Sequence, residues 1–265
     1  MSTVLLRREI KAHWKLVLIF TIVLSIYGGM IISMFDPKLG ESLKMMEQSM
    51  SQLFAAFGMS DAGTSLIEFI ANYLYGFLFV VFPMIFSLIL SSMVMVRYID
   101  HGSMAYLLST PTTRTKIAGT QAAVLLIGVF FLVGYVTIFC SICSGILFPK
   151  ELDLPKFFLL NVGLLCLHIF LSGIAFFCSC VWNETRKAVG VSAGLCILFV
   201  LIQMVAQVGE KFEVLRYITP LTLFNVDGFT AGESIALWQA GILLIFGVLF
   251  YAAGIVSFRK RDLPL

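Results

Sequence analysis

Six long stretches of the chain carry no Asp, Glu, Lys or Arg, and this pattern constrains the fold more than any other feature. Each stretch reaches the roughly 20 residues that a helix needs to cross the hydrocarbon core of a bilayer. The formal charges all fall between these stretches or at the chain ends. The pattern therefore predicts six membrane spans: residues 16–35, 69–96, 117–148, 157–183, 188–209 and 234–258.

The composition agrees with a membrane protein. Hydrophobic residues make up 60% of the 265 residues and charged residues 12%, whereas about a quarter of the residues of a soluble domain are charged. Inside lipid the backbone must satisfy its own hydrogen bonds, which favours helices, and the short alternating strands of a membrane barrel do not occur. We expect an all-α membrane protein in which residues 1–265 form a single transmembrane domain.

The basic residues indicate an orientation. The N-terminal segment, the 97–116 loop, the 184–187 turn and the C-terminal tail together hold 12 of the 18 Lys and Arg residues but only 4 of the 15 acidic residues. Basic residues accumulate on the cytoplasmic side of a membrane. We therefore expect a multi-pass protein of the cell membrane, in a bacterium, with both termini in the cytoplasm.

Residues 1–15 have the spacing of an amphipathic helix that lies on the inner membrane surface. Basic and apolar residues recur on different sides of this helix: Arg7, Lys11 and Lys15 against Leu6, Ile10 and Trp14. Such a helix would bring its basic side to anionic lipid headgroups. The alternative is a positively charged anchor with no further role.

Two loops on the outer side also contain apolar residues at helical spacing. In the first outer loop, 36–68, apolar residues form one stripe at helical spacing: Leu39, Leu43, Met46, Met50, Leu53 and Phe57. The stripe predicts a helix that covers the outer leaflet, closes a substrate path or contacts a partner. In the loop 210–233, Pro220 argues against one continuous helix. This second loop predicts a pair of short helices that dip into the outer leaflet.

The inner loop 97–116 contains a short helix with exposed apolar residues. Gly102 ends the preceding helix, and Ser103 is placed to cap a helix over about 103–109. Pro111 suits the first turn of the next helix. A plain connector does not need Tyr106, Leu107 and Leu108 on its surface, so we expect these residues to enter a groove of a soluble partner.

The spans contain almost no ionisable chemistry. Ion-coupled carriers usually keep a charged residue near the bilayer midplane, and His168 is the only ionisable candidate deep within a span. Ser172 lies four residues later on the same helix face, so these two residues form a possible polar site. A neutral His168 that is hydrogen bonded inside the bundle is the simpler interpretation.

Enzyme chemistry is not expected. The chain has no GxxxxGK[ST] phosphate loop, so energy for uphill transport would have to come from another polypeptide. We expect no catalytic residues, no metal site and no cofactor in this chain. The six cysteines, Cys140 and Cys143 included, lie in the predicted spans and are interpreted as small apolar packing residues.

The inner loop resembles a motif of the transmembrane permease subunits of ABC-2 type exporters. That motif has an acidic residue, Gly and Thr or Ser, then Leu-Leu-Ser-x-Pro, two residues and Arg. The matching stretch is Gly102-Ser-Met-Ala-Tyr-Leu-Leu-Ser-Thr-Pro-Thr-Thr-Arg-Thr-Lys-Ile117, where Asp100 precedes the glycine in place of the usual Glu. The six spans, the N-terminal helix and the ending Phe258-x-x-Arg-Asp-Leu263 are similar to the same family.

The resemblance implies a six-helix, type V-like exporter domain. It implies that 103–109 is the coupling helix on a separate ATP-binding subunit, which would hold ATP and Mg²⁺. The coupling residues would be Asp100, Gly102, Ser103, Tyr106, Leu107, Leu108, Ser109, Pro111 and Arg114. The partners implied are two ATP-binding subunits and a second permease chain, identical or related, in contact with membrane lipid and without nucleic acid.

Within the span 188–209, Gly190 and Gly194 have a small-xxx-small spacing that permits close packing of helices, such as those of two permease chains. The path would suit a hydrophobic or amphipathic cargo: a peptide, a lipid or a drug-like molecule. Two other functions remain open from the sequence. The chain could be a non-transporting immunity or sensor partner of an ATPase, or an ion-coupled carrier.

Overall fold

The computed structural model describes the chain except residues 1, 37–48, 59–64, 111, 209 and 262–265, together with the side chains of residues 210, 211 and 213. Within that part six helices are long and apolar enough to cross a membrane, and no strand is present. Five of the six are single helices, listed in chain order: α1 (Thr3–Ser33), α8 (Arg114–Leu147), α9 (Leu154–Val181), α10 (Thr185–Gln207) and α12 (Ser234–Lys260). The prediction of an all-α bundle with six spans is confirmed.

Several of these helices extend a few residues beyond the stretches that carry no charge. Asp153 caps α9, because its side chain accepts a hydrogen bond from the Lys156 amide. Thr113 caps α8 in the same way through the Lys116 amide. The charged residues thus occupy the first turns of the helices rather than separate loops.

The second span is a composite helix. It consists of α4 (Leu66–Ile70), the π-helical segment η2 (Ala71–Tyr75), α5 (Leu78–Ser91), a second π-helical segment η3 (Ser92–Val96) and α6 (Arg97–Asp100). The helix is interrupted at Gly76 and Phe77, where Phe77 has φ −140° and ψ −54°. A Cβ atom on Gly76 would overlap the carbonyl oxygen of Phe57. This break positions one wall of the cavity described below.

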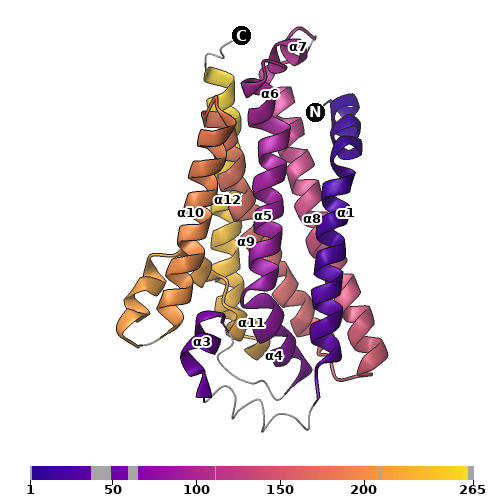
Figure 1. Cartoon of the computed structure of the whole chain (residues 1–265), viewed down its shortest axis with the longest axis vertical. Helices are drawn as coiled ribbons and strands as arrows, with labels where there is room; N and C mark the ends of the chain where they lie inside the picture. Colours follow the sequence, from indigo (N-terminus) through magenta and orange to yellow (C-terminus); the bar gives the residue numbers. More distant parts are fainter. Residues whose placement is uncertain (1, 37–48, 59–64, 111, 209, 262–265) are drawn as a thin grey trace.

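The helix α9 lies at the centre of the bundle, with the other spans around it (Figure 1). In the most apolar stretch of α9, 83% of the residues are buried, whereas only 17% are buried in the corresponding stretches of α1 and of α10. Glycines allow α12 to approach α9 closely, because a Cβ atom on Gly173 would lie 2.9 Å from the carbonyl oxygen of Gly247. We conclude that α9 organises the core, and that α1 and α10 present most of their surface outward.

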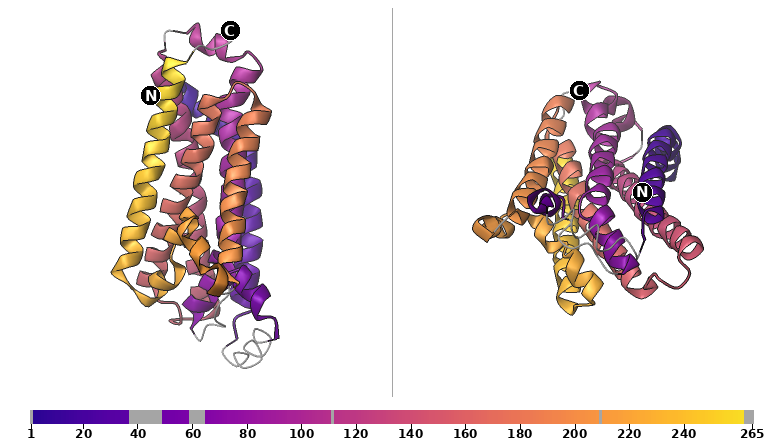
Figure 2. Two further views of the ribbon diagram at one scale, coloured as in Figure 1. Left: turned by 90° about the vertical axis from the view of Figure 1, so that its left-hand side faces the viewer. Right: turned by 60° about the horizontal axis from the view of Figure 1, so that its bottom comes forward.

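The first span differs from its prediction. One continuous helix, α1, covers both the expected surface helix 1–15 and the span 16–35, because no Pro or Gly occurs where the two were expected to separate. Hydrogen bonds join Ser2 to Thr120 and Ser25 to Tyr135. At 1.5 Å per residue these pairs lie about 34 Å apart along α1 but about 22 Å apart along α8. The first turns of α1 therefore bend, and the N-terminus lies to one side of the rest of the helix (Figure 2).

The first turns of α1 have one face that is buried and two that were predicted from the sequence. The buried face consists of Leu5 and Glu9, with His13 partly buried behind them. The predicted basic face is directed away from the bundle, with Arg7, Lys11 and Lys15 exposed. Of the predicted apolar face, Ile10 and Trp14 are exposed, whereas Leu6 is half-buried against the core. An orientation on the membrane surface stays a prediction.

The start of α1, the end of α12 and the short helix α7 (Met104–Leu108) lie at one end of the bundle, which we call the terminal end (Figure 1). The opposite end carries α3 (Ser51–Ala56), α4 and α11 (Val226–Ala231). Of the stripe predicted in 36–68, Leu39, Leu43 and Met46 lie outside the described residues, while Met50 and Leu53 are exposed.

The segment between α10 and α12 contains three short helical pieces rather than the predicted pair. They are the 3₁₀ helices η4 (Glu210–Tyr217) and η5 (Pro220–Leu223), followed by α11. Phe229 of α11 is 2% exposed and packs on Gly163 of α9, where a Cβ atom would overlap the ring. This segment therefore folds back into the opposite end of the bundle.

Candidate functional site

The predicted coupling segment lies at the terminal end. The helix α6 ends at Asp100, and Gly102 follows with φ +69°, in the left-handed region that favours glycine. No atom of the described residues lies within 4 Å of a Cβ atom built on Gly102, so the backbone conformation is what requires glycine here. The turn then leads into α7, which occupies 104–108 of the expected 103–109.

The side chains of α7 have unequal roles. Met104 is 1% exposed and anchors the helix in the core, whereas Tyr106 is 80% exposed. Leu107 and Leu108 are half-buried and pack against the chain's own core, so the expected exposed surface of three apolar residues reduces to Tyr106. This difference arises because a five-residue helix that packs through Met104 also turns the two leucines partly inward.

Ser103 does not cap α7 as predicted. Its hydroxyl instead donates to the carbonyl oxygen of Tyr98 at 3.3 Å. At the other end of α7, Ser109 donates to the carbonyl of Tyr106 and Thr110 to that of Leu107, at 2.9 and 2.6 Å. These bonds occupy carbonyl groups that a short helix leaves free. Pro111 lies outside the described residues.

Asp100 and Arg114 tie this segment to other helix ends. The Asp100 carboxylate accepts a hydrogen bond from the Thr185 amide at the start of α10, at 3.1 Å. It therefore acts as an N-cap supplied from a distant part of the chain. Arg114 donates to the carbonyl oxygen of Arg261 at 2.6 Å, and Arg261 donates to that of Cys180 at 2.5 Å. The ends of α8, α12 and α9 are thus joined next to α7.

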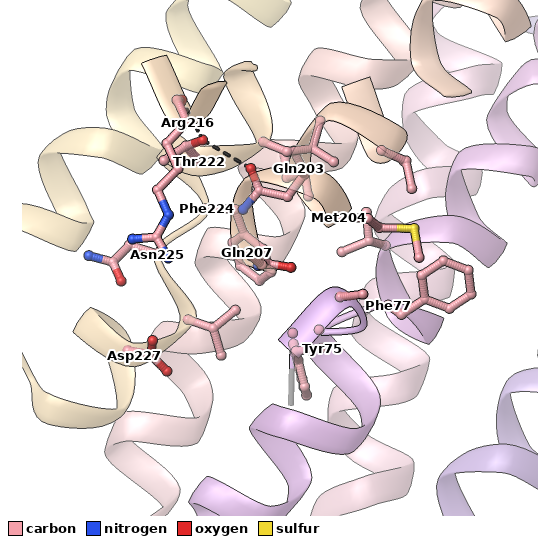
Figure 3. A pocket seen from close by; sticks show the side chains of 18 of the residues that line it. Tyr75, Phe77, Gln203, Met204, Gln207, Arg216, Thr222, Phe224, Asn225 and Asp227 are labelled. Carbon is pink, nitrogen blue, oxygen red and sulfur yellow. Dashed lines mark hydrogen bonds between the residues drawn. The ribbon is translucent and has the colours of Figure 1, made fainter. Parts of the chain in front are cut away.

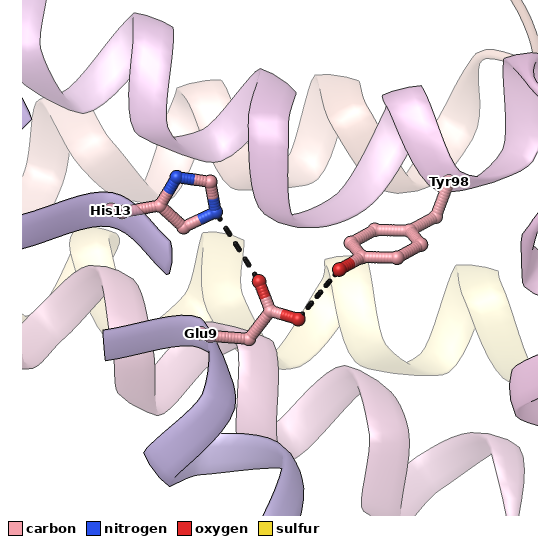
Figure 4. Close-up of polar contacts among 3 residues, drawn as sticks. All are labelled: Glu9, His13 and Tyr98. Carbon is pink, nitrogen blue, oxygen red and sulfur yellow. Dashed lines mark hydrogen bonds and ion pairs between the residues drawn. The ribbon is translucent and has the colours of Figure 1, made fainter. Parts of the chain in front are cut away.

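A buried carboxylate lies beside the same segment, and the sequence reasoning missed it (Figure 4). Glu9 is 0% exposed; it accepts a hydrogen bond from the Tyr98 hydroxyl at 2.6 Å and contacts His13 Nε2 at 3.2 Å. Tyr98 in turn binds Ser103 through its carbonyl oxygen. The available signal was the position of Glu9 as the one acid in a basic segment, in helical register with Leu5 and His13.

The structure does not bring His168 and Ser172 together as one polar site. Nε2 of His168 donates to the carbonyl oxygen of Phe79 in α5 at 2.8 Å. That carbonyl has no helical partner, because the residue four positions later is Pro83, which lacks an N–H. Ser172 instead accepts a hydrogen bond from Tyr251 of α12 at 2.8 Å. The two side chains fasten α9 to different neighbours.

Gly190 and Gly194 lie on an open face of α10. Among the described residues, no atom is found within 4 Å of a Cβ atom built on either residue, so neither supports a helix contact in that part of the chain. The same face exposes Val191, Ile197, Leu198 and Leu201. The six cysteines are free thiols, five of them buried, which agrees with a packing role.

A cavity of about 260 Å³ lies at the opposite end, between the break in the second span, the end of α10 and the segment that precedes α12 (Figure 3). Its polar lining consists of carboxamides, hydroxyl groups and two charged side chains: Gln203, Gln207, Asn225 and Gln239, then Tyr75 and Thr222, then Arg216 and Asp227. Phe77, Val80 and Met204 belong to its apolar lining. The sequence contained a signal for it, in the glutamines near the ends of charge-free stretches.

The polar groups of this cavity are only partly paired. The Thr222 hydroxyl lies 3.0 Å from Oε1 of Gln203 and 2.7 Å from the Arg216 carbonyl oxygen. Oδ1 of Asn225 accepts a hydrogen bond from the Gly228 amide and so caps α11. Oε1 of Gln239 is buried without a partner in the part of the chain that the structure describes. Among the same residues, no group of three or more His, Cys, Asp and Glu could hold a metal.

Comparisons with known proteins bear on both ends. A comparison with curated protein sequences returns no match. The family model described as ABC-2 family transporter protein matches residues 6–263, which include the apolar parts of all six spans, the predicted coupling segment and the lining of the cavity. Such a membrane protein belongs to an ABC transporter, which has an ATP-binding partner. This multi-pass membrane protein therefore belongs to the ABC-2 transporter family.

Proposed function

We propose that this chain is the permease subunit of an ATP-driven exporter and that α7 docks on a separate subunit that binds ATP and Mg²⁺. The observation that carries the proposal is Tyr106, which is 80% exposed on a helix that Met104 anchors in the core. A fixed helix with one projecting aromatic residue is suited to a groove on a partner, since aromatic residues often dominate binding energy at interfaces. Membership of the ABC-2 family supports the same partner.

The protein would lie in the cell membrane, with the terminal end facing the cytoplasm. Most Lys and Arg residues belong to segments at this end, and the exposed basic residues of α1 are among them. This distribution agrees with the rule that basic residues stay inside. The cavity would then open toward the outer side, where an exporter releases its cargo.

The assembly would contain two permease chains, identical or related, and two ATP-binding subunits. The open face of α10 supports this, because Gly190 and Gly194 offer space that a second helix can approach closely. Exposed leucine and isoleucine on the same face also suit lipid, so the glycines are the feature that favours a helix as neighbour.

The hydrogen bonds around α7 provide a route for coupling. Motion of α7 would reach α10 through Asp100 and Thr185, and would reach α8, α9 and α12 through Arg114 and Arg261. Because these bonds join helix ends rather than flexible loops, a push on α7 would tilt helices as rigid bodies. Rocking of two such bundles would open the path outward for a hydrophobic or amphipathic cargo.

The test is copurification of the ATP-binding subunit with the tagged chain from its native cells in mild detergent. Tyr106→Glu should abolish recovery of a Walker-motif ATPase, because it places a charge in the docking groove. The matched control is Tyr217→Glu, since Tyr217 is 90% exposed at the opposite end. Leu107→Glu is a weaker test, because Leu107 packs against the chain's own core.

Equal recovery of the ATPase with both variants would contradict docking through α7. A non-transporting partner of an ATPase would also lose its ATPase in this test. The two functions are separated by ATP turnover of the reconstituted complex, which an exported compound changes only if the chain transports it.

A further inference from the structure

The cavity at the opposite end has two chemically different sides. Figure 3 shows Arg216, Asn225 and Asp227 on one side, Met204 and Phe77 on the other, and Gln203 and Gln207 between them. A cavity that served only as a packing defect would be lined by apolar atoms and would stay dry. This one gathers polar groups from α10, α11 and α12, and therefore has the composition of a binding site.

The carboxamide groups have hydrogen-bonding capacity to spare. Oε1 of Gln239 is buried without a partner within the described chain. The hydrogen bonds of the described residues include none from the Gln207 side chain. Leaving a buried polar group unpaired costs about 1–3 kcal/mol, so a ligand that donates a hydrogen bond to Oε1 of Gln239 in this cavity would remove that cost. Each carboxamide can donate and accept at once.

The dimensions limit the occupant. A volume of about 260 Å³ corresponds to about nine water molecules, at roughly 30 Å³ each. This is near the lower end of the volumes of small-molecule sites. The cavity therefore has room for one small polar group with an adjacent apolar group, and a larger cargo would enter with only part of its structure.

We propose that this cavity binds an uncharged amide or hydroxyl group of the exported cargo, while Phe77, Val80 and Met204 receive an apolar group next to it. Carboxamides match such groups because both sides donate and accept. Arg216 and Asp227 bring opposite charges to the same lining, which gives no preference for a net charge. The identification of the ligand as cargo rests on the proposed function, whereas the binding itself does not.

The test uses the full chain in lipid nanodiscs and three small probes. N-acetyl-phenylalaninamide presents an amide beside a benzyl group, 2-phenylethyl glucoside presents hydroxyls, and N-acetyl-phenylalanine carries a carboxylate. Isothermal titration calorimetry should detect saturable binding of at least one neutral probe, with the carboxylate at least about tenfold weaker. The better neutral probe identifies amide or hydroxyl as the preferred group.

The variants are Gln207→Leu and Gln239→Leu, which keep approximate size and remove hydrogen bonding. Each should weaken the neutral probe about tenfold, the ratio that corresponds to about 1.4 kcal/mol. Gln239→Leu should not lower the melting temperature, because it removes an unpaired polar atom. The matched control is Gln121→Leu, since Gln121 is a buried carboxamide of α8 away from this cavity.

Three results would overturn the proposal: no saturable binding of either neutral probe at millimolar concentration, equal binding of the carboxylate, or undiminished binding by both cavity variants. None of them affects the copurification test with Tyr106→Glu. If the ATPase is recovered but no probe binds, docking on the ATP-binding subunit stands and the cavity assignment fails. If a probe binds but no ATPase is recovered, the cavity is a binding site without a role in ATP-driven export.

Discussion

The two ends of this bundle treat their polar groups differently. At the terminal end, Glu9, Asp100 and Arg114 each make a hydrogen bond to a distant helix. At the opposite end, the carboxamides of Gln207 and Gln239 line a cavity. Closed hydrogen bonds transmit displacement, whereas polar groups that face a cavity can exchange partners. The difference suggests that one end receives a mechanical input and the other handles a ligand.

The apolar residues follow the same division. At the terminal end Met104 fills the core and leaves Tyr106 projecting outward. At the opposite end Phe229 points inward and fixes the segment that shapes the cavity. One end thus displays an aromatic side chain for a partner, and the other uses aromatic side chains to build an internal space. Breaking each arrangement separately should affect different properties.

The largest effect is expected from Gly163→Val, which breaks the opposite end. A side chain at this position overlaps the Phe229 ring, so the buried ring must shift, and we expect α11 to move with it and the cavity to change shape. We expect a loss of about 1–3 kcal/mol of stability, as for other overpacked cores, and loss of probe binding. Thermal unfolding in nanodiscs, followed by circular dichroism, measures the first effect.

The control for that variant is Gly134→Val, because no atom in the described part of the chain lies within 4 Å of a Cβ atom at Gly134. Both variants place the same β-branched residue within a long helix, so their difference isolates the contact with Phe229. Equal stability of the two variants would mean that α11 does not depend on its contact with α9. ATPase recovery should be reduced by neither variant if the two ends act separately.

A smaller effect is expected from Tyr98→Phe at the terminal end. The substitution removes the hydroxyl that donates to Glu9 at 2.6 Å and keeps the ring. Hydrogen bonds to charged groups contribute about 1.5–3 kcal/mol, and partial exposure of Tyr98 places the expected loss near the lower value. The same unfolding measurement applies, and hydrogen exchange of the first turns of α1 should become faster.

Tyr27→Phe is the matched control, because Tyr27 is 40% exposed and its hydroxyl makes no hydrogen bond within the described chain. If Tyr98→Phe leaves both stability and exchange unchanged, Glu9 does not hold α1 against the segment before α7. The first turns of α1 would then not be fixed to the rest of the terminal end by this hydrogen bond.

The sequence predicted the features that depend on the lipid environment or on local backbone conformation. The six spans follow from the absence of charges, because lipid excludes charges regardless of how helices pack. Gly102 and the helix after it follow from local backbone preference. These features need no knowledge of neighbouring helices, and so the pattern along the chain was enough.

The features that were missed or wrong depend on pairs of helices. The partner of His168 is a carbonyl that Pro83 leaves free, 89 residues away. The inward turn of Leu107 and Leu108 depends on how Met104 packs. The burial of Glu9 depends on the bend of α1 toward Tyr98. Spacing along one helix cannot supply such information, because it says nothing about which face meets which neighbour.

The smallest effect is expected from Asp100→Ala, which tests whether the segment before α7 is tied to α10. Asp100 is exposed, so its loss should leave global stability nearly unchanged, but the Thr185 amide would lose its acceptor. We expect faster hydrogen exchange at Thr185 and the first turn of α10, with no change in α8. Glu184→Ala is the control, because the Glu184 side chain pairs with Lys187 and makes no cap bond. If both variants leave the exchange of Thr185 unchanged, Asp100 does not couple α7 to α10, and the hydrogen bonds of Arg114 and Arg261 remain as links between helix ends at this end of the bundle.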